Sequence, residues 1–261
     1  MRGVDVHQDK GNPDWRRAFA AGVRFAWLKV SEGSGGPPNE KILPWYTRNS
    51  PAAKAAGIRV GGYHFLTTGI PSSTPQEEAA FFVSRLKLAP GDLLPACDFE
   101  QEPPDGSQVL AFLRAVEQHI GVKPILYVNS DFLDRSFARA TEAERQALQK
   151  FPLWFADYGV NDGSDHGIHH NTHGFKVVAH QFTSKGTISG VESPTDLNEL
   201  IAPSLDAFTF KAGSGPGHGP PWELVVGDTV KAKGRLTNPA YILKIARALR
   251  QEGRVVLREK S

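Results

Sequence analysis

Two carboxylic acids are spaced so that they could act on one bond. Asp98 and Glu100 end the apolar segment that begins at Pro95. The side-chain period of two in a β-strand puts both on one face, with Cα atoms roughly 6.5–7 Å apart. Neighbouring carboxyl groups can have their pKa values driven apart, so that one stays protonated while the other is ionised. Glycosidic bond cleavage needs this division, because the leaving oxygen is protonated while a positive, oxocarbenium-like centre is stabilised.

Two further acids strengthen this interpretation. Asp5 lies between Val4 and Val6 in a strand-like segment, where burying a carboxylate is costly unless it serves a purpose. Asp196 follows the last predicted strands, although an aspartate there also fits a helix N-cap or a turn. The Asp-x-Glu pair alone equally fits two solvated loop residues. Acids at the ends of several different strands, however, are what the mouth of a β/α barrel would show.

The elements that must position these acids alternate along the chain. The predicted strands are residues 2–7, 23–30, 58–65, 93–99, 124–128, 153–156 and 176–182. The predicted helices are residues 12–21, 44–56, one starting at Thr74, 107–120 and 141–150, with capping boxes at Thr74 and Thr141. This alternation predicts a parallel sheet covered by helices, of the α/β class. Residues 187–191 are expected to form the second strand of a terminal antiparallel pair.

Seven ordered blocks of sequence resemble the family-25 glycoside hydrolase lysozymes. The blocks span about residues 1–205 and are Gly3-Val4-Asp5-Val6, Phe25 to Gly33, Gly61-Gly62-Tyr63-His64-Phe65, Asp98-Phe99-Glu100, Leu153 to Tyr158, His180-Gln181-Phe182-Thr183 and Thr195-Asp196-Leu197-Asn198. The resemblance implies an irregular, TIM-like β/α barrel. It also implies hydrolysis of the β-1,4 bond between N-acetylmuramic acid and N-acetylglucosamine in peptidoglycan, as in a phage endolysin or a bacterial autolysin.

The same resemblance assigns roles to the acids. It implies that Glu100 is the general acid and that Asp98, Asp5 and Asp196 complete the catalytic cluster. Asp98 would be either a nucleophile or the group that stabilises the substrate's own N-acetyl oxygen during attack. One departure is visible, since the family often has Ser after Asp-Val and this chain has His7. We expect altered contacts at the floor of the groove there and retained chemistry.

Aromatic residues beside the predicted strand ends are candidates for binding sugar rings. Tyr63, Trp154 and Tyr158 could stack on the C–H faces of a glycan in an open groove, although core packing is an equal alternative for Trp154. Lys29 and Glu32 either form a structural ion pair or line the groove. Gln181 completes the set of predicted substrate-binding residues.

Two other functions compete with the hydrolase. The segment from Asp165 to His173 contains four histidines, His166, His169, His170 and His173, and could serve a metal-dependent glycan deacetylase. The segment contains Gly and Asn and has no helical pattern, so a flexible surface loop is the stronger interpretation and no metal or other cofactor is predicted. A non-catalytic peptidoglycan-binding protein is the second alternative, which the presence of all four acids disfavours.

The chain divides at a Gly- and Pro-rich run. We predict a catalytic domain over residues 1–208, a linker over 209–222 and a small basic module over 223–261. The module contains two short strands, a helix over 239–251 and a last strand near 254–257. It carries nine basic and four acidic residues, a formal charge of +5. It could bind an anionic wall polymer or assist oligomerisation, or its charges could simply form a solvated helix face.

Overall composition excludes several classes of protein. The 261 residues carry 30 basic and 28 acidic side chains, so the net charge of +2 does not indicate binding of nucleic acid or an anionic membrane through the whole surface. Cys97 is the single cysteine and cannot form an internal disulfide. The apolar runs are too short to span a bilayer, and no signal peptide is recognisable. We therefore expect cytoplasmic synthesis and action on the cell wall after release by a holin or by lysis.

Overall fold

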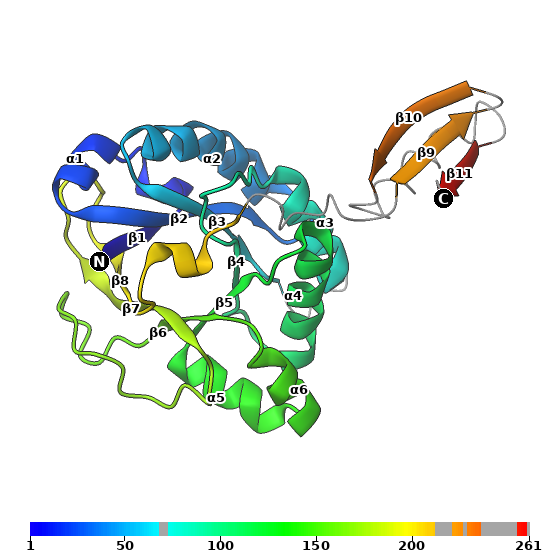
Figure 1. The fold of residues 1–261 in the computed structure, drawn as a ribbon. Helices are drawn as coiled ribbons and strands as arrows, with labels where there is room; N and C mark the ends of the chain where they lie inside the picture. The colour runs from blue at the N-terminus through cyan, green and yellow to red at the C-terminus, as the bar shows by residue number, and fades with distance from the viewer. Residues whose placement is uncertain (68–72, 212–220, 227–228, 236–254, 260–261) are drawn as a thin grey trace.

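The structure is a computed structural model that describes residues 1–67, 73–211, 221–226, 229–235 and 255–259. Eight strands form a closed barrel in chain order (Figure 1). They are β1 (Arg2–Val6), β2 (Val23–Glu32), β3 (Arg59–Phe65), β4 (Ala96–Asp98), β5 (Ile125–Asn129), β6 (Leu153–Ala156), β7 (Val177–Gly186) and β8 (Thr195–Leu200). Strands β1 to β7 pair in parallel, whereas β8 is antiparallel to both β7 and β1. The predicted α/β class and irregular barrel are confirmed.

Helices follow most of the strands and lie around the outside of the barrel (Figure 1). They are α1 (Trp15–Ala20), α2 (Pro37–Ala55), α3 (Pro75–Arg85), α4 (Gly106–Ile120), α5 (Ser130–Arg139) and α6 (Glu142–Leu148), with the short 3-10 helices η1 (Gln8–Lys10) and η2 (Leu205–Phe208). Both predicted capping boxes are present, at the starts of α3 and α6. Among the described residues, no helix has the length and apolar character needed to cross a bilayer.

Two local predictions were wrong, and one helix was missed. Helix α2 begins at Pro37, seven residues before the predicted start, and holds Pro44 and Pro51 inside it. Its buried face, which includes Trp45, Tyr46 and Ala53, packs on the barrel and outweighs the missing backbone hydrogen bonds. Helix α5 was not predicted at all. The terminal antiparallel pair exists, but its second strand is Thr195–Leu200 and residues 187–191 are not in a strand.

Side-chain alternation along each strand separates an inner core from an outer one. On β2, Phe25 and Trp27 belong to the cluster inside the barrel, whereas Ala26 and Leu28 belong to the cluster under the helices. Inside, Trp27 stacks on Trp154 with ring centroids 4.3 Å apart. A Cβ atom at Gly61 would lie 2.5 Å from the Trp27 ring, so this glycine makes room for the indole pair.

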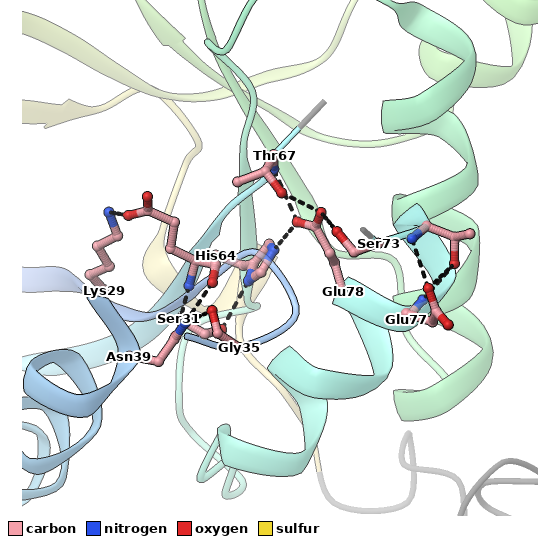
Figure 2. Close-up of polar contacts among 11 residues, drawn as sticks. Lys29, Ser31, Gly35, Asn39, His64, Thr67, Ser73, Glu77 and Glu78 are labelled. Atoms are coloured by element: carbon pink, nitrogen blue, oxygen red, sulfur yellow. Dashed lines mark hydrogen bonds and ion pairs between the residues drawn. The ribbon is translucent and has the colours of Figure 1, made fainter. Parts of the chain in front are cut away.

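A buried polar network lies outside the barrel wall, between β3 and α3 (Figure 2). His64 and Glu78 are both fully buried, and His64 Nε2 lies 3.0 Å from Glu78 Oε2. Since a carboxylate only accepts, Nε2 donates and Nδ1 accepts from the Ser31 hydroxyl at 2.9 Å. Glu78 also accepts from Thr67 N at 3.0 Å, from the Thr67 hydroxyl and from Ser73 Oγ at 2.8 Å. We call these five residues the outer network.

The C-terminal segment contains a second sheet. Strands β9 (Pro221–Val226), β10 (Thr229–Arg235) and β11 (Val255–Glu259) form an antiparallel sheet in the order β10-β9-β11. The predicted helix over 239–251 and the Gly/Pro-rich run over 212–220 lie outside the described residues. Hydrogen bonds to the barrel continue as far as Phe210, whose backbone contacts Gly91 and Asp92.

Candidate active site

The four predicted acids line one cleft at the end of the barrel where the parallel strands finish and the antiparallel β8 begins. Val4 and Val6 face the outer core, so Asp5 between them points to the barrel axis, and Cys97 does the same for Asp98. The cleft has a volume of about 180 Å³. Its lining consists of four acids, four aromatic residues, a histidine and an amide: Asp5, Asp98, Glu100, Asp196, Tyr63, Tyr127, Trp154, Tyr158, His7 and Gln181.

The register of the strands brings the acids together. Asp5 and Asp196 are directly paired across β1 and β8. Asp98 is the last residue of β4, and Glu100 follows two residues later, so both lie at the same edge of the barrel. The pairing of β8 with β1 closes the barrel and is therefore what places the C-terminal acid beside the N-terminal one.

Burial raises the pKa of every acid in the cleft, and the charges of neighbouring acids raise it further for Asp5, Asp98 and Glu100. For Asp5, the pKa is raised well above its ordinary value by burial first and then by the charges of Asp196 and Glu100. Burial followed by the charge of Glu100 raises the pKa of Asp98 in the same way. Burial and Asp196 raise the pKa of Glu100, while Lys29 opposes the shift. The pKa of Asp196 is raised by burial and partly restored by Lys10.

One fully buried oxygen in this cluster has no hydrogen-bond partner among the described residues. Oδ1 of Asp98 is buried, and no donor within the described chain reaches it. An ionised carboxylate without donors is costly in a buried site, which is consistent with the raised pKa of Asp98. Burial and the missing donors therefore make ionisation of Asp98 costly, and the charge of Lys29 offsets part of that cost.

Asp5 is held in the opposite way, by two amides. Its Oδ1 accepts a hydrogen bond from Gln181 Nε2 at 2.8 Å and another from Asn198 Nδ2 at 2.8 Å. The Oε1 of Gln181 in turn accepts from the hydroxyls of Tyr127, at 2.8 Å, and Tyr158, at 2.6 Å. All these residues except Tyr158 are buried. Gln181, predicted to bind substrate, thus contacts the cleft while its amide is already bonded at both ends.

The three predicted aromatic residues all reach the cleft, with different degrees of freedom. Trp154 is 1% exposed, stacks on Trp27 and donates from Nε1 to Asn198 Oδ1 at 2.7 Å. Tyr63 is also buried and meets the edge of the Trp154 ring. Tyr158 is only half-buried. Trp154 and Tyr63 therefore form the floor of the cleft, and Tyr158 is the ring most available to a ligand.

Lys29 and Glu32 do not line the cleft. Lys29 Nζ forms an ion pair with Glu32 Oε2 at 2.6 Å and lies 4.8 Å above the centre of the Phe65 ring (Figure 2 shows the pair). The charge of Lys29 nevertheless lowers the pKa of both Asp98 and Glu100 against the effect of burial. Lys29 therefore acts on the acids through its charge, while its ion pair with Glu32 is structural.

The histidine-rich segment after β6 is tied down by aspartates. Asp157 accepts from the backbone N–H groups of His169 and His170 and from His170 Nδ1 at 2.9 Å. His166 and His173 pair with Asp162 and Asp134. Within the described ranges, no three side chains of His, Cys, Asp or Glu gather to hold a metal ion. The deacetylase alternative finds no support in this arrangement.

Two residues that line the cleft, Tyr127 and His7, and one behind it, Asn198, were missing from the sequence prediction or given no role there. Tyr127 lies on a predicted strand, and its alternation with Leu126 and Val128 would have placed it inside. Asn198 was quoted only as part of a motif, since nothing local indicates that it faces Asp5. His7 was noted as a departure and lines the cleft, where burial lowers its pKa.

Comparison with known proteins gives one family. The family described as Glycosyl hydrolases family 25 matches residues 4–191. The uncharacterized protein YegX of Escherichia coli is 25% identical over 209 residues, which cover 76% of this chain and 68% of that protein. The autolytic lysozyme of Clostridium acetobutylicum is 24% identical over 221 residues, covering 83% of this chain and 61% of that one. The crystal structure of a bacterial lysozyme from Streptomyces coelicolor superposes with a TM-score of 0.65 at 21% identity, over 77% of this chain and 92% of that one.

Proposed function

The chain belongs to glycosyl hydrolase family 25 and is a glycoside hydrolase of the lysozyme type that acts on peptidoglycan; from this premise, we propose that it cleaves the β-1,4 bond between N-acetylmuramic acid and N-acetylglucosamine. The observation that carries the proposal is the convergence of Asp5, Asp98, Glu100 and Asp196 on one cleft with a floor of aromatic rings. A glycan strand needs acids for chemistry and flat apolar surfaces for its sugar rings, and the cleft supplies both.

Glu100 is the general acid of the proposed reaction. A general acid must hold its proton near the working pH, whereas an ordinary glutamate titrates near pH ~4.3. Burial and the charge of Asp196 raise the pKa of Glu100. Glu100 lies beyond the end of β4 and is the most exposed of the four cleft acids. It can therefore deliver its proton to the glycosidic oxygen as the bond breaks.

Asp98 acts on the opposite charge. As the glycosidic bond breaks, positive charge develops at the anomeric carbon, and an ionised Asp98 stabilises it. We propose that Asp98 does so by orienting the N-acetyl group of the substrate, whose carbonyl oxygen attacks the anomeric carbon. Water then opens the resulting ring and restores the N-acetyl group. The alternative is direct attack by Asp98, which forms a covalent glycosyl-enzyme before water releases the sugar.

The bond cleaved is tested by mass spectrometry of peptidoglycan digested with the full chain. Fragments with muramic acid at the reducing end would support the proposal. Fragments ending in glucosamine would replace it with glucosaminidase activity, and loss of acetyl groups without new reducing ends would replace it with deacetylation. A fluorinated substrate analogue distinguishes the two mechanisms for Asp98, because only direct attack traps a covalent adduct.

The basic C-terminal segment is proposed to add affinity for the bacterial cell wall, where the substrate lies. Its support is the formal charge of +5 over residues 223–261. Replacing Lys231, Lys233 and Arg235 by Gln should reduce sedimentation of the full chain with purified walls at low salt and leave it unchanged at high salt. Equal sedimentation of both proteins at every salt concentration would reject this role. Release to the wall by a holin or by lysis remains part of the same proposal.

A further inference from the structure

The orientation of Asp5 is fixed from behind the cleft. Its two amide donors come from adjacent strands, Gln181 from β7 and Asn198 from β8, and both bond to the same oxygen, Oδ1. Both amides are buried to 1% exposure or less. Across the described residues, no hydrogen bond to the second oxygen, Oδ2, is present. Asp5 thus has one oxygen bound to the protein and one left for whatever enters the cleft.

The orientation of each amide is itself determined by a donor on its other side. The indole N–H of Trp154 can only donate, so it fixes Oδ1 of Asn198 on its own side and the Asn198 amino group toward Asp5. Flipping the amide would set two N–H groups against each other and leave Asp5 facing an oxygen. The hydrogen bonds therefore run in one direction, from Trp154 to Asn198 and from Asn198 to Asp5.

Gln181 is oriented by two tyrosine hydroxyls. Tyr127 and Tyr158 both place their oxygens within hydrogen-bond distance of Oε1 of Gln181. Burial raises the pKa of both phenols, so each keeps the proton that it donates to Oε1. The amino group of Gln181 is consequently directed at Asp5. Two independent chains of donors thus converge on the same carboxylate oxygen.

This arrangement decides where a proton on Asp5 can reside. With two N–H donors on Oδ1, that oxygen can only accept, so a protonated Asp5 must carry its hydrogen on Oδ2. We propose that Gln181 and Asn198 are positioning residues, which hold Asp5 so that Oδ2 alone faces the substrate and is the only oxygen that gives or receives a proton there. The proposal rests on the proposed function for its consequence in catalysis, but its structural part does not.

The amides also set the protonation of Asp5. Hydrogen bonds to a carboxylate favour its ionised form, and those from Asn198 and Gln181 lower the pKa of Asp5 against the effects of burial and of Asp196. Removing one of them should therefore raise that pKa further. A residue that only filled space in the barrel would have no such effect.

The first test follows Asp5 directly by NMR. The full chain is labelled with ¹³C at the aspartate carboxyl groups, and the Asp5 resonance is assigned with Asp5→Asn. Gln181→Met keeps the length of the side chain and removes its hydrogen bond to Asp5 together with the two from Tyr127 and Tyr158, so we expect it to raise the pKa of Asp5 by about 1. Asn198→Leu should do the same. An unchanged titration of Asp5 in both folded variants would overturn the proposal.

A matched control is available on the same strand. Thr183 is buried on β7 and donates to Asn161 Oδ1 at 2.7 Å, but within the described chain its hydroxyl makes no hydrogen bond to Asp5. Thr183→Val should leave the Asp5 titration as in the unaltered chain. A rise equal to that in Gln181→Met would show that any buried lesion on β7 moves the titration, which would also overturn the proposal. If Gln181→Met does not fold, Tyr127→Phe removes one of the two donors to Oε1 and should give a smaller rise.

The second test concerns turnover. Gln181→Met should lower kcat by about tenfold while changing KM by less than about threefold, since a misplaced Asp5 affects the transition state more than binding. Thr183→Val should leave kcat unchanged. The two proposals fail separately. An intact NMR response with no muramic acid reducing ends would refute the proposed function alone, whereas normal products with an unresponsive Asp5 would refute only the positioning role.

Discussion

The two faces of the barrel wall treat buried acids in opposite ways. Tyr63 and His64 are consecutive on β3, yet Tyr63 points into the cleft and His64 points outward to the outer network. In the outer network, Glu78 accepts four hydrogen bonds, and these lower its pKa against the opposing effect of burial. In the cleft, Oδ1 of Asp98 has no partner among the described residues, and its pKa is raised.

The difference shows what each region is built to do. A buried carboxylate with enough donors stays ionised and fixes the elements that supply those donors, here Thr67 and Ser73 beside α3. Buried carboxyl groups without enough donors repel one another and hold protons that an ordinary acid would lose. The outer network therefore contributes to stability, whereas the cleft holds groups that cost stability and can transfer protons.

The largest expected effect is on activity in the cleft. Glu100→Gln should lower the release of reducing ends from peptidoglycan by about 10³-fold, because the amide has no proton to give to the leaving oxygen. The change is nearly isosteric and removes a charge that burial and Asp196 disfavour, so the thermal unfolding midpoint should be no lower than that of the unaltered chain. A reducing-sugar assay together with circular dichroism measures both.

Glu102 is the matched control for this substitution. It lies two residues further along, is exposed and pairs with Arg135 at 2.6 Å, outside the cleft. Glu102→Gln should retain activity. If Glu100→Gln also retained activity, Glu100 would not differ in function from a surface acid, and its role as the general acid would be refuted.

The next largest effect should be on stability in the outer network. Glu78→Ala removes the acceptor of His64, Thr67 and Ser73 and leaves buried donors without partners, so we expect the free energy of unfolding to fall by about 3 kcal/mol. Urea denaturation of the full chain measures it. Glu77→Ala, on the exposed side of the same helix start, should give a smaller loss, because only the capping box is affected. Equal losses would show that the outer network adds nothing beyond the cap.

In the cleft, removing an acid should increase stability instead of lowering it. Asp98→Asn removes a carboxyl group that burial and Glu100 disfavour in its ionised form, so it should raise the free energy of unfolding at pH 7 by about 1 kcal/mol while activity falls. The pKa of Asp98 is raised on folding, so its contribution to stability is full below the unfolded pKa and is lost as pH rises. The gain from Asp98→Asn should therefore shrink as pH approaches 4.

A buried aspartate with partners provides the control. Asp92 accepts from Lys54 Nζ at 2.6 Å and from Ala89 N at 2.8 Å. Asp92→Asn, the same chemical change, should lower the free energy of unfolding at pH 7. Urea denaturation at pH 7 and pH 4 compares the two variants, and a loss of stability in both would remove the distinction between partnered and unpartnered acids.

How much of this could be read from the sequence depends on the range of each interaction. The strand period of two predicted that Asp98 and Glu100 share a face, and the acids at several strand ends predicted the mouth of a barrel, because both patterns are local in the sequence. The family resemblance supplied the barrel and the enzyme class. The amides on Asp5 could not be predicted, since they depend on the register of β7 and β8 and on the bulges between those strands. The outer network likewise joins residues from three elements with no local pattern.

The smallest expected effect is a pH dependence in the outer network. Burial lowers the pKa of His64 from its ordinary value of 6.5, although Glu78 opposes the shift. Below about pH 6.5 the unfolded chain binds a proton that folded His64 does not, so stability is present above that pH and is lost as pH falls. Between pH 7 and pH 5 this group should reduce the free energy of unfolding by about 1 kcal/mol.

His64→Gln tests this pH dependence because it removes the titrating ring and keeps a side chain that can donate to Glu78. The variant should be less stable than the unaltered chain at pH 7, but its free energy of unfolding should change less between pH 7 and pH 5. Ser31→Ala is the control, since it removes the hydrogen bond to Nδ1 and keeps the ring, so most of the pH dependence should persist. An equal pH dependence in His64→Gln and the unaltered chain would mean that the loss of stability at low pH arises from another titrating group.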